Sequence, residues 1–528
     1  MLFILLAVVH TWPLASAPAT LSRNDTGDTV LHEWTLAWVA HQVVRDPLHL
    51  FDANIFYPER TTLAYSDHLF VQAMMTAPIL WAGGSPVLAY NLLLIAGLAL
   101  TGWTTSLVVH RWTGSWLAAT LSGSLMAFNA FTLTRLPEVQ DLHFEFFPLA
   151  LLALDRLLTR PRVPSALTLA GWSVLHALTC GYLLVFGFIS LVVATVVRPE
   201  TWSRRIRQIG PLLLLAAGIA GLALLPFMIP YFRVSRDQGL TRPLSEVSRY
   251  SAHAADYFAT GGRLHFALWS RLFFKNYGLF PGLIAAVLSG IAVGTGVAVK
   301  DSRARMAVAF GLVALALSFG PAFPPYRWLY DIFPLLRGLR GAVRFGQFFL
   351  AAVAILAGFG LSVLEPHLRR RGLAVGLLLI VGANLEALRA PLEYSPYRGT
   401  PRIYDALSGS GRAVVVCFPL YSHDAISLNT EYMLASTRFW KPMLNGYSGF
   451  VPASFNRHGS ALAGFPNPAS IEYLRSLDVS HVVVESRLMD RVRLDQLDRI
   501  SQLQMWASDG NVRIYLLKHA ARPAAGEE

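Results

Sequence analysis

The sequence predicts an α-helical polytopic membrane protein with a small C-terminal α/β domain outside the membrane. Of the 528 residues, 54% are hydrophobic and only 14% are charged, whereas soluble domains carry about 25% charged residues. Apolar runs of about 20 residues, the length that crosses a bilayer, recur up to about residue 390. Beyond that point the hydrophobicity falls and short strand-like runs appear. These changes indicate a membrane domain at 1–390 and an extracytoplasmic α/β domain at 391–528.

The positive charge of the chain reports its orientation in the membrane. The formal net charge is +12, which by itself is also typical of nucleic-acid-binding proteins. Here, however, the basic residues gather in short loops between apolar runs, as the positive-inside rule describes for cytoplasmic loops. These loops contain Arg156, Arg160 and Arg162; Arg198, Arg204, Arg205 and Arg207; Lys300, Arg303 and Arg305; and Arg369, Arg370 and Arg371. We therefore expect a membrane protein with no nucleic-acid partner.

About eleven spans place the amino terminus inside and the carboxyl terminus outside. They are expected near 1–18, 86–109, 115–134, 139–157, 164–180, 182–198, 209–230, 279–299, 304–320, 346–364 and 372–389. The pair at 164–180 and 182–198 is short, so it could instead form a hairpin that does not fully cross. The first run could also be a signal peptide ending at Ala15-Ser16-Ala17, but it lacks a basic n-region, which favours a retained span.

The first outer loop, roughly 19–85, is expected to hold two helices at the membrane surface. Residues 68–84 are apolar but number only 17, and a span there would place the arginine loops outside. We therefore interpret this segment as a re-entrant or interfacial helix. A second surface helix is indicated by an apolar stripe at helical spacing, formed by Trp34, Leu36, Trp38, Val39 and Val43.

The C-terminal domain combines predicted strands and helices. Strands are expected at 413–418, 481–485 and 512–517, and helices near 401–408, 469–477 and 491–503. The chain has two cysteines, Cys180 and Cys417, which lie too far apart to indicate a metal motif or a disulfide framework.

Asp25 and Asp28 follow the first apolar run and are the first candidates for chemistry. Carboxylates are costly near hydrocarbon unless they face water, a partner or a substrate. Each could act as a general base towards a hydroxyl or hold a divalent metal. The alternative is that they cap a helix beginning near Thr29. For Asp28 we favour the catalytic role over the cap, and for Asp25 the case is weaker.

A second charged group lies at the next outer turn, between Arg135 and Glu145. It contains Glu138, Asp141 and His143 as well. A carboxylate here, either Glu138 or Asp141, could complete a metal site or hold a protonated leaving group. A solvated loop whose charges pair among themselves is an equally good interpretation.

Two later segments carry residues suited to binding. Arg337, Arg340 and Arg344 lie in an expected outer loop, against the positive-inside trend, and guanidinium groups bind phosphate oxygens bidentately. The alternative is contact with lipid headgroups without turnover. Trp440, Asn445 and Tyr447 lie in an aromatic and amide-rich stretch, 436–450, that suits sugar recognition or, equally, an ordered structural loop. The sequence has no Walker loop, GxSxG or HExxH motif.

This arrangement resembles the GT-C superfamily of integral membrane glycosyltransferases, which take sugars from polyprenyl-phosphate carriers. The resemblance covers nearly the whole chain in architecture, but its sequence motifs are short. They are Gly27-Asp28, Phe56-Tyr57-Pro58, Leu279-Phe280-Pro281-Gly282 and Asn445-Gly446-Tyr447-Ser448.

The resemblance implies roles for particular residues. It makes Asp28 the first-loop catalytic acid, with Asp25 a less favoured occupant, and Glu138 or Asp141 the second-loop acid. Arg340 and Arg344 would contact the carrier phosphate. The chain lacks the compact Asp-Glu or Asp-x-Asp pair of better-known branches, so its metal dependence stays open. A divalent ion such as Mg²⁺ or Mn²⁺, if used, would involve Asp28 and Asp141.

The function expected from these features is inverting sugar transfer at the outer face of a bacterial inner membrane. The donor would be an undecaprenyl-phosphate-type sugar, the acceptor a glycan, lipid or protein, and membrane lipids the surroundings. The alternatives are a transporter or flippase for a lipid-linked glycan and a non-catalytic envelope scaffold. Transporters place broken helices and charges at midplane depth, whereas the spans here are almost free of charge.

Overall fold

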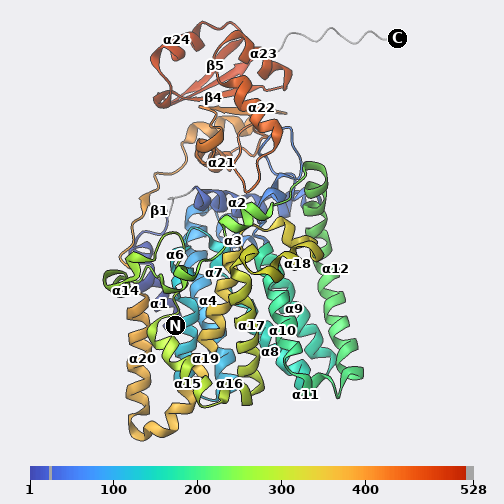
Figure 1. The fold of residues 1–528 in the computed structure, drawn as a ribbon. Coiled ribbons are helices and arrows are strands. Elements are labelled where there is room, and N and C mark those ends of the chain that lie inside the picture. The colour runs from blue at the N-terminus through green and yellow to red at the C-terminus, as the bar shows by residue number, and fades with distance from the viewer. Residues whose placement is uncertain (23–26, 519–528) are drawn as a thin grey trace.

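The computed structural model describes residues 1–22 and 27–518 as a long helical bundle with an α/β domain at one end (Figure 1). We call this end of the bundle the domain end. Within the described residues, four helical segments are long and apolar enough to cross a membrane. They are Pro86–Thr113, Trp116–Thr134, Ile206–Gln238 and Ala342–Ala387. The predicted class, a polytopic helical membrane protein with a small C-terminal sheet domain, is confirmed.

From residue 86 onward the bundle helices lie where the spans were predicted, but not all of their bounds agree. The helices are α4 (Pro86–Thr113), α5 (Trp116–Ala127), α6 (Ala130–Thr134), α7 (Val139–Leu142), α8 (Phe146–Thr159), α9 (Val163–Thr179), α10 (Gly181–Val196), α12 (Ile206–Gln238), α15 (Leu283–Gly294), α17 (Ser302–Ser318), α19 (Phe345–Leu368) and α20 (Gly372–Ala387). Helix α12 continues to Gln238, beyond the predicted end at 230, and the predicted span 139–157 is divided into α7 and α8. Local sequence sets these ends. Ser85 caps α4 by accepting from the Leu88 amide, and Gly114 ends it in the left-handed conformation that favours glycine.

Small residues let the central helices approach closely. A Cβ at Gly360 of α19 would collide with the Leu288 carbonyl of α15, and one at Gly358 would crowd Val109 of α4. Contacts between helices in a bilayer depend on such close packing, because lipid tails are as apolar as the side chains. At the centre of the bundle, α19 packs against α4, α5, α15 and α17, and α4 packs against α5.

The basic loops gather at the end of the bundle opposite the α/β domain. Two short helices, α11 (Pro199–Trp202) and α16 (Val297–Lys300), mark this end in Figure 1. Here Asp155 accepts from Arg198 at 2.6 Å and from Arg303 at 3.1 Å. The turn between α19 and α20, which holds Arg369–Arg371, lies at the same end. The basic loops therefore share one end of the bundle, as the positive-inside pattern predicts.

The first predicted span is wrong as a single crossing helix. Helix α1 (Leu2–His10) has nine residues, which amounts to about 14 Å, or half the thickness of a bilayer core. The chain then passes through a turn at Pro13 and a short 3₁₀ segment, Leu14–Ser16. Proline cannot donate the backbone hydrogen bond that would continue the helix. The apolar composition of 1–18 indicated membrane burial but not where the helix would end.

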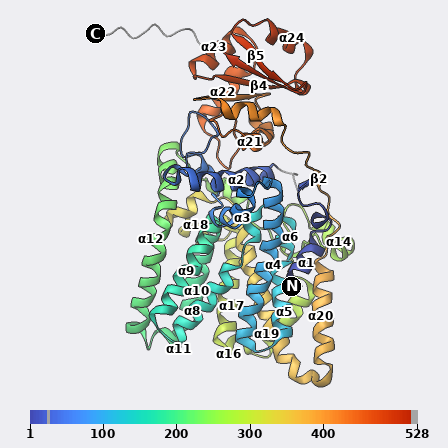
Figure 2. The same ribbon diagram turned by 180° about the vertical axis from the view of Figure 1, so that it is seen from behind.

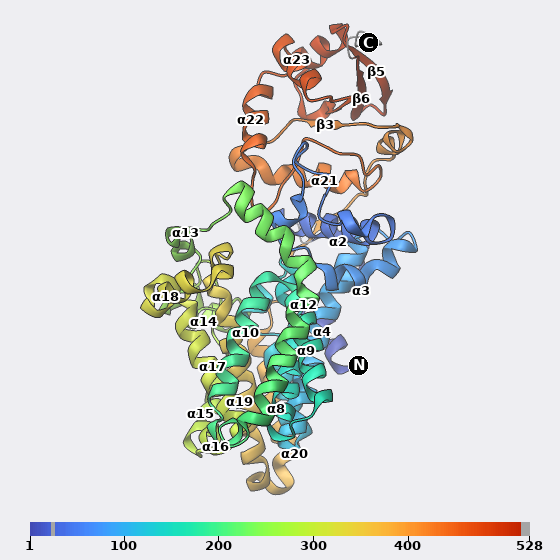
Figure 3. The same ribbon diagram turned by 90° about the vertical axis from the view of Figure 1, so that its right-hand side faces the viewer.

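Two helices of the first loop lie at the domain end without traversing the bundle (Figures 1 and 3). They are α2 (Asp28–Arg45) and α3 (Phe70–Trp81), at the two positions where surface helices were expected. One side of α2 is buried against α3 and α4, and another against α21 of the C-terminal domain. Helix α2 therefore connects the two parts of the molecule.

The C-terminal domain contains a four-stranded sheet in the order β3-β4-β6-β5. Its strands are β3 (Val415–Phe418), β4 (His481–Glu485), β5 (Leu503–Ser508) and β6 (Val512–Leu517), and its helices are α21 (Thr430–Ser436), α22 (Ala453–Leu462), α23 (Pro468–Ser476) and α24 (Arg491–Arg499). Strands β3 and β4 are parallel and the other neighbours antiparallel. Seen from behind, α21 and the loops beside it face the bundle (Figure 2). The three predicted strands are present, whereas β5 was missed.

A small strand pair ties the end of the membrane domain to the first loop. Strand β1 (Leu21–Ser22) pairs antiparallel with β2 (Ser395–Pro396). The predicted boundary between domains at 390/391 lies close to the end of α20 at Ala387, and it stays a prediction.

Candidate active site

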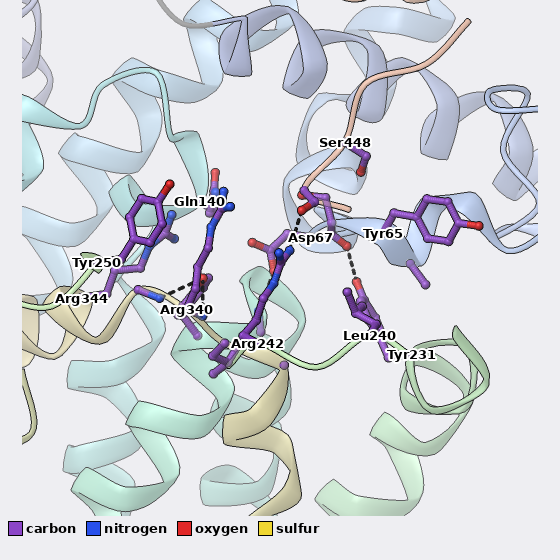
Figure 4. Close-up of a pocket in the computed structure, with 18 of the residues that line it drawn as sticks. Tyr65, Asp67, Gln140, Tyr231, Leu240, Arg242, Tyr250, Arg340, Arg344 and Ser448 are labelled. Atoms are coloured by element: carbon purple, nitrogen blue, oxygen red, sulfur yellow. Dashed lines mark hydrogen bonds between the residues drawn. The ribbon is translucent and has the colours of Figure 1, made fainter. Parts of the chain in front are cut away.

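A cavity of about 630 Å³ lies at the domain end of the bundle, between the membrane domain and the C-terminal domain. Figure 4 shows part of its lining. The walls come from α2, the segment before α3, the turn between α6 and α8, the start of α10, the end of α12 and residues 334–344. Residues 447–449 and Val451 of the C-terminal domain close one side. Segments far apart in the sequence therefore meet in one polar chamber.

Asp28 lines this cavity at the start of α2. Gly27 precedes it in a left-handed conformation, φ 80°, and a Cβ there would approach Ser427 at 3.0 Å. The side chain of Asp28 accepts a hydrogen bond from the Tyr447 hydroxyl at 3.0 Å. Burial and, next, the negative charge of Glu138 raise its pKa, against the lowering effects of His32 and Tyr447. Raised carboxylate pKa values in clefts are typical of acid–base groups.

The second-loop acids form a buried four-charge network with two arginines. Arg344 donates to Glu138 at 2.7 Å and to Asp141 at 2.6 Å. Arg135 lies 2.8 Å from Glu138 and 2.7 Å from the other oxygen of Asp141. Burial alone would raise the pKa of Glu138, but the two guanidinium groups lower it to about 2. Glu138 is thus held ionised beside Asp28, which is why it raises the pKa of its neighbour.

Arg344 is enclosed by its partners. Besides the two carboxylates, its guanidinium lies over the ring of Tyr182, 4.3 Å from the centroid. With both carboxylates bound, this arginine has little charge left to offer a phosphate. It lines the cavity, but its contacts are those of a residue that positions the acids. The sequence indicated an anion-binding arginine here without showing that internal carboxylates would reach it.

Two other arginines present more of their charge to the cavity. Arg242 and Arg340 bind the same oxygen of Glu246, at 3.2 and 3.4 Å. The guanidinium of Arg340 also lies 4.8 Å from the ring centroid of Tyr250, and Arg242 donates to the Gly449 carbonyl. Both arginines line the cavity, whereas Glu246 is not part of its lining. Two positive groups for one carboxylate give this wall a net positive charge suited to an anion.

Sequence reasoning missed the importance of Arg242. It lies in the long segment 231–278, among Arg233, Arg236 and Arg249, and no spacing distinguishes it from them. Only the fold brings it beside Arg340, through the shared Glu246.

Three predicted binding residues lie outside the cavity. Arg337 is exposed and donates to the carbonyls of Tyr330 and Asp331. Trp440 stacks on His41 of α2, with ring centroids 4.2 Å apart. Asn445 is fully buried and bonds both backbone groups of Cys417. The structure gives these three side chains structural contacts.

The other predicted residues are distributed as follows. Asp28, Glu138, Arg340, Arg344 and Tyr447 line the cavity, while Asp141 lies buried directly behind it. Asp25 lies outside the described residues. The fold therefore brings the first-loop acid, one second-loop acid and two of the three predicted arginines to one place.

The arrangement does not fit a divalent metal between Asp28 and Asp141. Each oxygen of Asp141 is bound by a different guanidinium, so neither is available as a ligand without breaking an ion pair. Across residues 1–22 and 27–518, no group of three or more His, Cys, Asp or Glu is placed to hold a metal ion. Arg135 and Arg344 occupy the positions next to the acids that a cation would take.

Comparison with solved structures places this architecture in a known fold. The chain matches the mycobacterial arabinofuranosyltransferase AftD with a TM-score of 0.63 and 15% identity, over 99% of this chain and 39% of that one. It matches ArnT from Cupriavidus metallidurans, solved with undecaprenyl phosphate, with a TM-score of 0.50 and 12% identity, over 98% and 97% of the two chains. No protein-family model and no curated sequence matches it.

The chain therefore has the same overall fold as AftD and ArnT. The chain spans about two fifths of the length of AftD and nearly all of ArnT. These identities are low, so the likeness establishes the fold, and the activity has to be argued from the cavity.

Proposed function

We propose that the protein is a membrane glycosyltransferase that moves a sugar from a polyprenyl-phosphate donor to an acceptor hydroxyl. One observation carries the proposal: within a GT-C fold, a single cavity holds a carboxylate with a raised pKa, Asp28, and a wall made positive by Arg242 and Arg340. A base for the acceptor and a cationic site for a departing phosphate are the two groups that such a transfer needs.

The proposed reaction is a single in-line displacement that inverts the anomeric carbon. The acceptor hydroxyl gives its proton to the Asp28 carboxylate as its oxygen forms a bond to the anomeric carbon. The bond between that carbon and the phosphate oxygen breaks, and the electron pair leaves with the carrier phosphate. Arg242 and Arg340 stabilise the negative charge that develops on this phosphate. Tyr447 holds the Asp28 side chain through its hydrogen bond.

Arg135 and Arg344 act as positioning residues in this proposal. They neutralise Glu138 and Asp141 and fix them at the base of the cavity. Glu138, kept ionised, raises the pKa of Asp28 and makes it a stronger base. Because the arginines already satisfy both acids, we propose that transfer requires no divalent metal.

The apolar part of the lining suits the first units of a lipid carrier. It comes from α10, α12 and the segment before Arg340, namely Leu184, Val185, Met228, Phe232, Leu335 and Leu339. A cavity of about 630 Å³ is of the size that holds a single small ligand. It accommodates the sugar phosphate, while the remainder of the carrier chain lies in the membrane.

The location proposed is a bacterial inner membrane with the domain end facing outwards. The basic loops at the opposite end support this orientation. The acceptor is a glycan, a lipid or a protein that reaches the cavity from that side.

The experiment that tests this function combines turnover and carrier binding. Purified protein is given a panel of radiolabelled undecaprenyl-phosphate sugars, with and without EDTA, and affinity for undecaprenyl phosphate is measured separately. We expect transfer or hydrolysis of at least one donor that persists in EDTA. We also expect Arg340→Ala and Arg242→Ala each to weaken carrier binding by about tenfold or more.

Arg337→Ala is the matched control, because Arg337 belongs to the same loop but lies outside the cavity. Its carrier affinity is expected to equal that of the wild type. Equal losses in all three variants would mean that the loop attracts lipid headgroups non-specifically. Carrier binding without turnover of any donor would instead favour a flippase or a scaffold.

A further inference from the structure

A second carboxylate, Asp67, lines the cavity from a different element. It lies in the segment between the 3₁₀ turn Thr62–Tyr65 and α3, and Figure 4 shows it among the lining side chains. One oxygen accepts from the Gly181 amide at 2.9 Å, and the other lies 3.4 Å from the Cys180 sulfur. Within the part of the chain that the structure describes, no Lys, Arg or His forms an ion pair with Asp67, in contrast to the paired Glu138.

Asp67 has a structural role, but its carboxylate can accept more hydrogen bonds than this role requires. Its bond to Gly181 caps the first turn of α10, and a helix N-terminus favours the negative charge. A carboxylate can accept about four hydrogen bonds. The described donors supply one amide and one thiol, which is a weak donor. The rest of this half-buried group is available to a ligand in the cavity.

The surroundings place Asp67 close to the arginines without neutralising it. Cys180 also contacts Arg344, at 3.9 Å, so a single side chain separates the two charges. Tyr182, two residues further on, accepts from the amides of Arg340 and Gly341, each at 3.3 Å. The Tyr231 hydroxyl donates to the Ser66 carbonyl at 2.9 Å and holds the segment that carries Asp67.

This neighbourhood determines what Asp67 can bind. A phosphate would be repelled by the carboxylate, and it has Arg242 and Arg340 nearby to bind instead. A group covalently linked to that phosphate and rich in hydroxyls would place its donors opposite Asp67. The sugar of a polyprenyl-phosphate donor is such a group.

We propose that Asp67 binds a hydroxyl of the donor sugar and selects neutral or amino sugars over uronic acids. This proposal rests on the proposed function, because it assigns the sugar end of the same donor. A hydroxyl or ammonium group donates a charge-assisted hydrogen bond to Asp67. A sugar carboxylate in the same position meets a like charge in a cavity of reduced dielectric and is rejected.

The test compares binding of the carrier with binding of the carrier plus sugar. The probes are undecaprenyl phosphate and its arabinofuranose, glucose and glucuronic acid derivatives, measured with the full-length protein in detergent. The variants are Asp67→Asn, which keeps the shape of the side chain, and Asp331→Asn, an exposed acid outside the cavity, as the control. Thermal melting of each variant establishes that it is folded.

The proposal predicts that Asp67→Asn binds undecaprenyl phosphate as the wild type does. Its affinity for the preferred neutral donor should fall by about 10- to 100-fold, and its discrimination against the glucuronic acid donor should shrink. Asp331→Asn should match the wild type with every probe.

Several results would overturn it. Equal loss of carrier and donor binding would show a purely structural cap, and unchanged donor binding would show that Asp67 does not contact the sugar. A wild type that binds neutral donors no better than the bare carrier would also contradict it. Absence of carrier binding in the wild type would instead contradict the proposed function itself, so the two failures are distinguishable.

Discussion

Asp28 depends on Tyr447 for part of its acidity, and this dependence can be measured. The hydrogen bond from the Tyr447 hydroxyl lowers the pKa of Asp28, while burial and Glu138 raise it. A general base must be ionised, so turnover should rise with pH through this pKa. Tyr447→Phe removes the lowering effect, so the acidic limb of the kcat profile should move to higher pH. An unshifted limb with a reduced plateau would mean that Tyr447 acts on the substrate instead.

Arg344 and Arg340 should respond differently to truncation. Arg344→Ala leaves Glu138 and Asp141 each with one buried partner fewer, and such losses cost about 3–5 kcal/mol. Arg340 is half-exposed and shares Glu246 with Arg242, so Arg340→Ala should leave stability nearly unchanged. Thermal unfolding in detergent measures both. A destabilised Arg340→Ala protein together with a stable Arg344→Ala protein would contradict the assignment of Arg344 to positioning the acids and of Arg340 to binding the phosphate.

Individual site residues could be predicted from the sequence where a residue type was unusual for its surroundings. A carboxylate after an apolar run marked Asp28, and arginines in an outer loop marked Arg340 and Arg344. Partners could not be predicted, because Arg344 meets Asp141 from a position 203 residues away. For the same reason, neither Arg242 nor Asp67 carried a signal in the sequence.

Helix α2 contains a buried acid whose protonation should make its packing sensitive to pH. Glu33 is 1% exposed, and burial raises its pKa from 4.5 to about 8, although a bond from Ser22 lowers it. The folded protein therefore binds this proton more tightly than the unfolded chain does. The stability that it contributes is complete below about pH 4.5 and is lost as the pH rises through about 8.

Melting of the wild type and Glu33→Gln across this range tests the assignment. The wild type should lose melting temperature on going from about pH 6 to about pH 9, and Glu33→Gln should lose less. The exposed Glu472→Gln serves as the control and should follow the wild type. Parallel curves for all three proteins would show that Glu33 does not hold a proton.

The positions of helices were predicted correctly where a single physical rule determines them. Apolar length and basic loops located the helices from α4 onwards, because both features respond directly to the bilayer. They failed for α1, where composition could not show that the helix ends at His10. Strand β5 was missed for a different reason. It is an edge strand whose residues from Gln504 to Trp506 are exposed, and it begins where the helix predicted near 491–503 was expected to end.

The whole molecule is expected to have its two ends on opposite sides of the membrane. Single cysteines at Arg370, in the turn between α19 and α20, and at Glu472, in the C-terminal domain, would report this orientation, because both positions are exposed. In intact cells with a permeable outer envelope, an impermeant thiol reagent should label Glu472→Cys and spare Arg370→Cys until the membrane is opened. The reverse pattern would place the cavity in the cytoplasm.

The central claim is that a single base, Asp28, drives sugar transfer in a cavity that binds the carrier independently. The most direct measurement is turnover of a radiolabelled undecaprenyl-phosphate sugar by wild type and Asp28→Asn, with carrier affinity determined for both. We predict a loss of about 10²- to 10⁴-fold in turnover, as for removal of a general base, with carrier affinity preserved. Turnover that survives in Asp28→Asn, with the carrier still bound, would contradict the account.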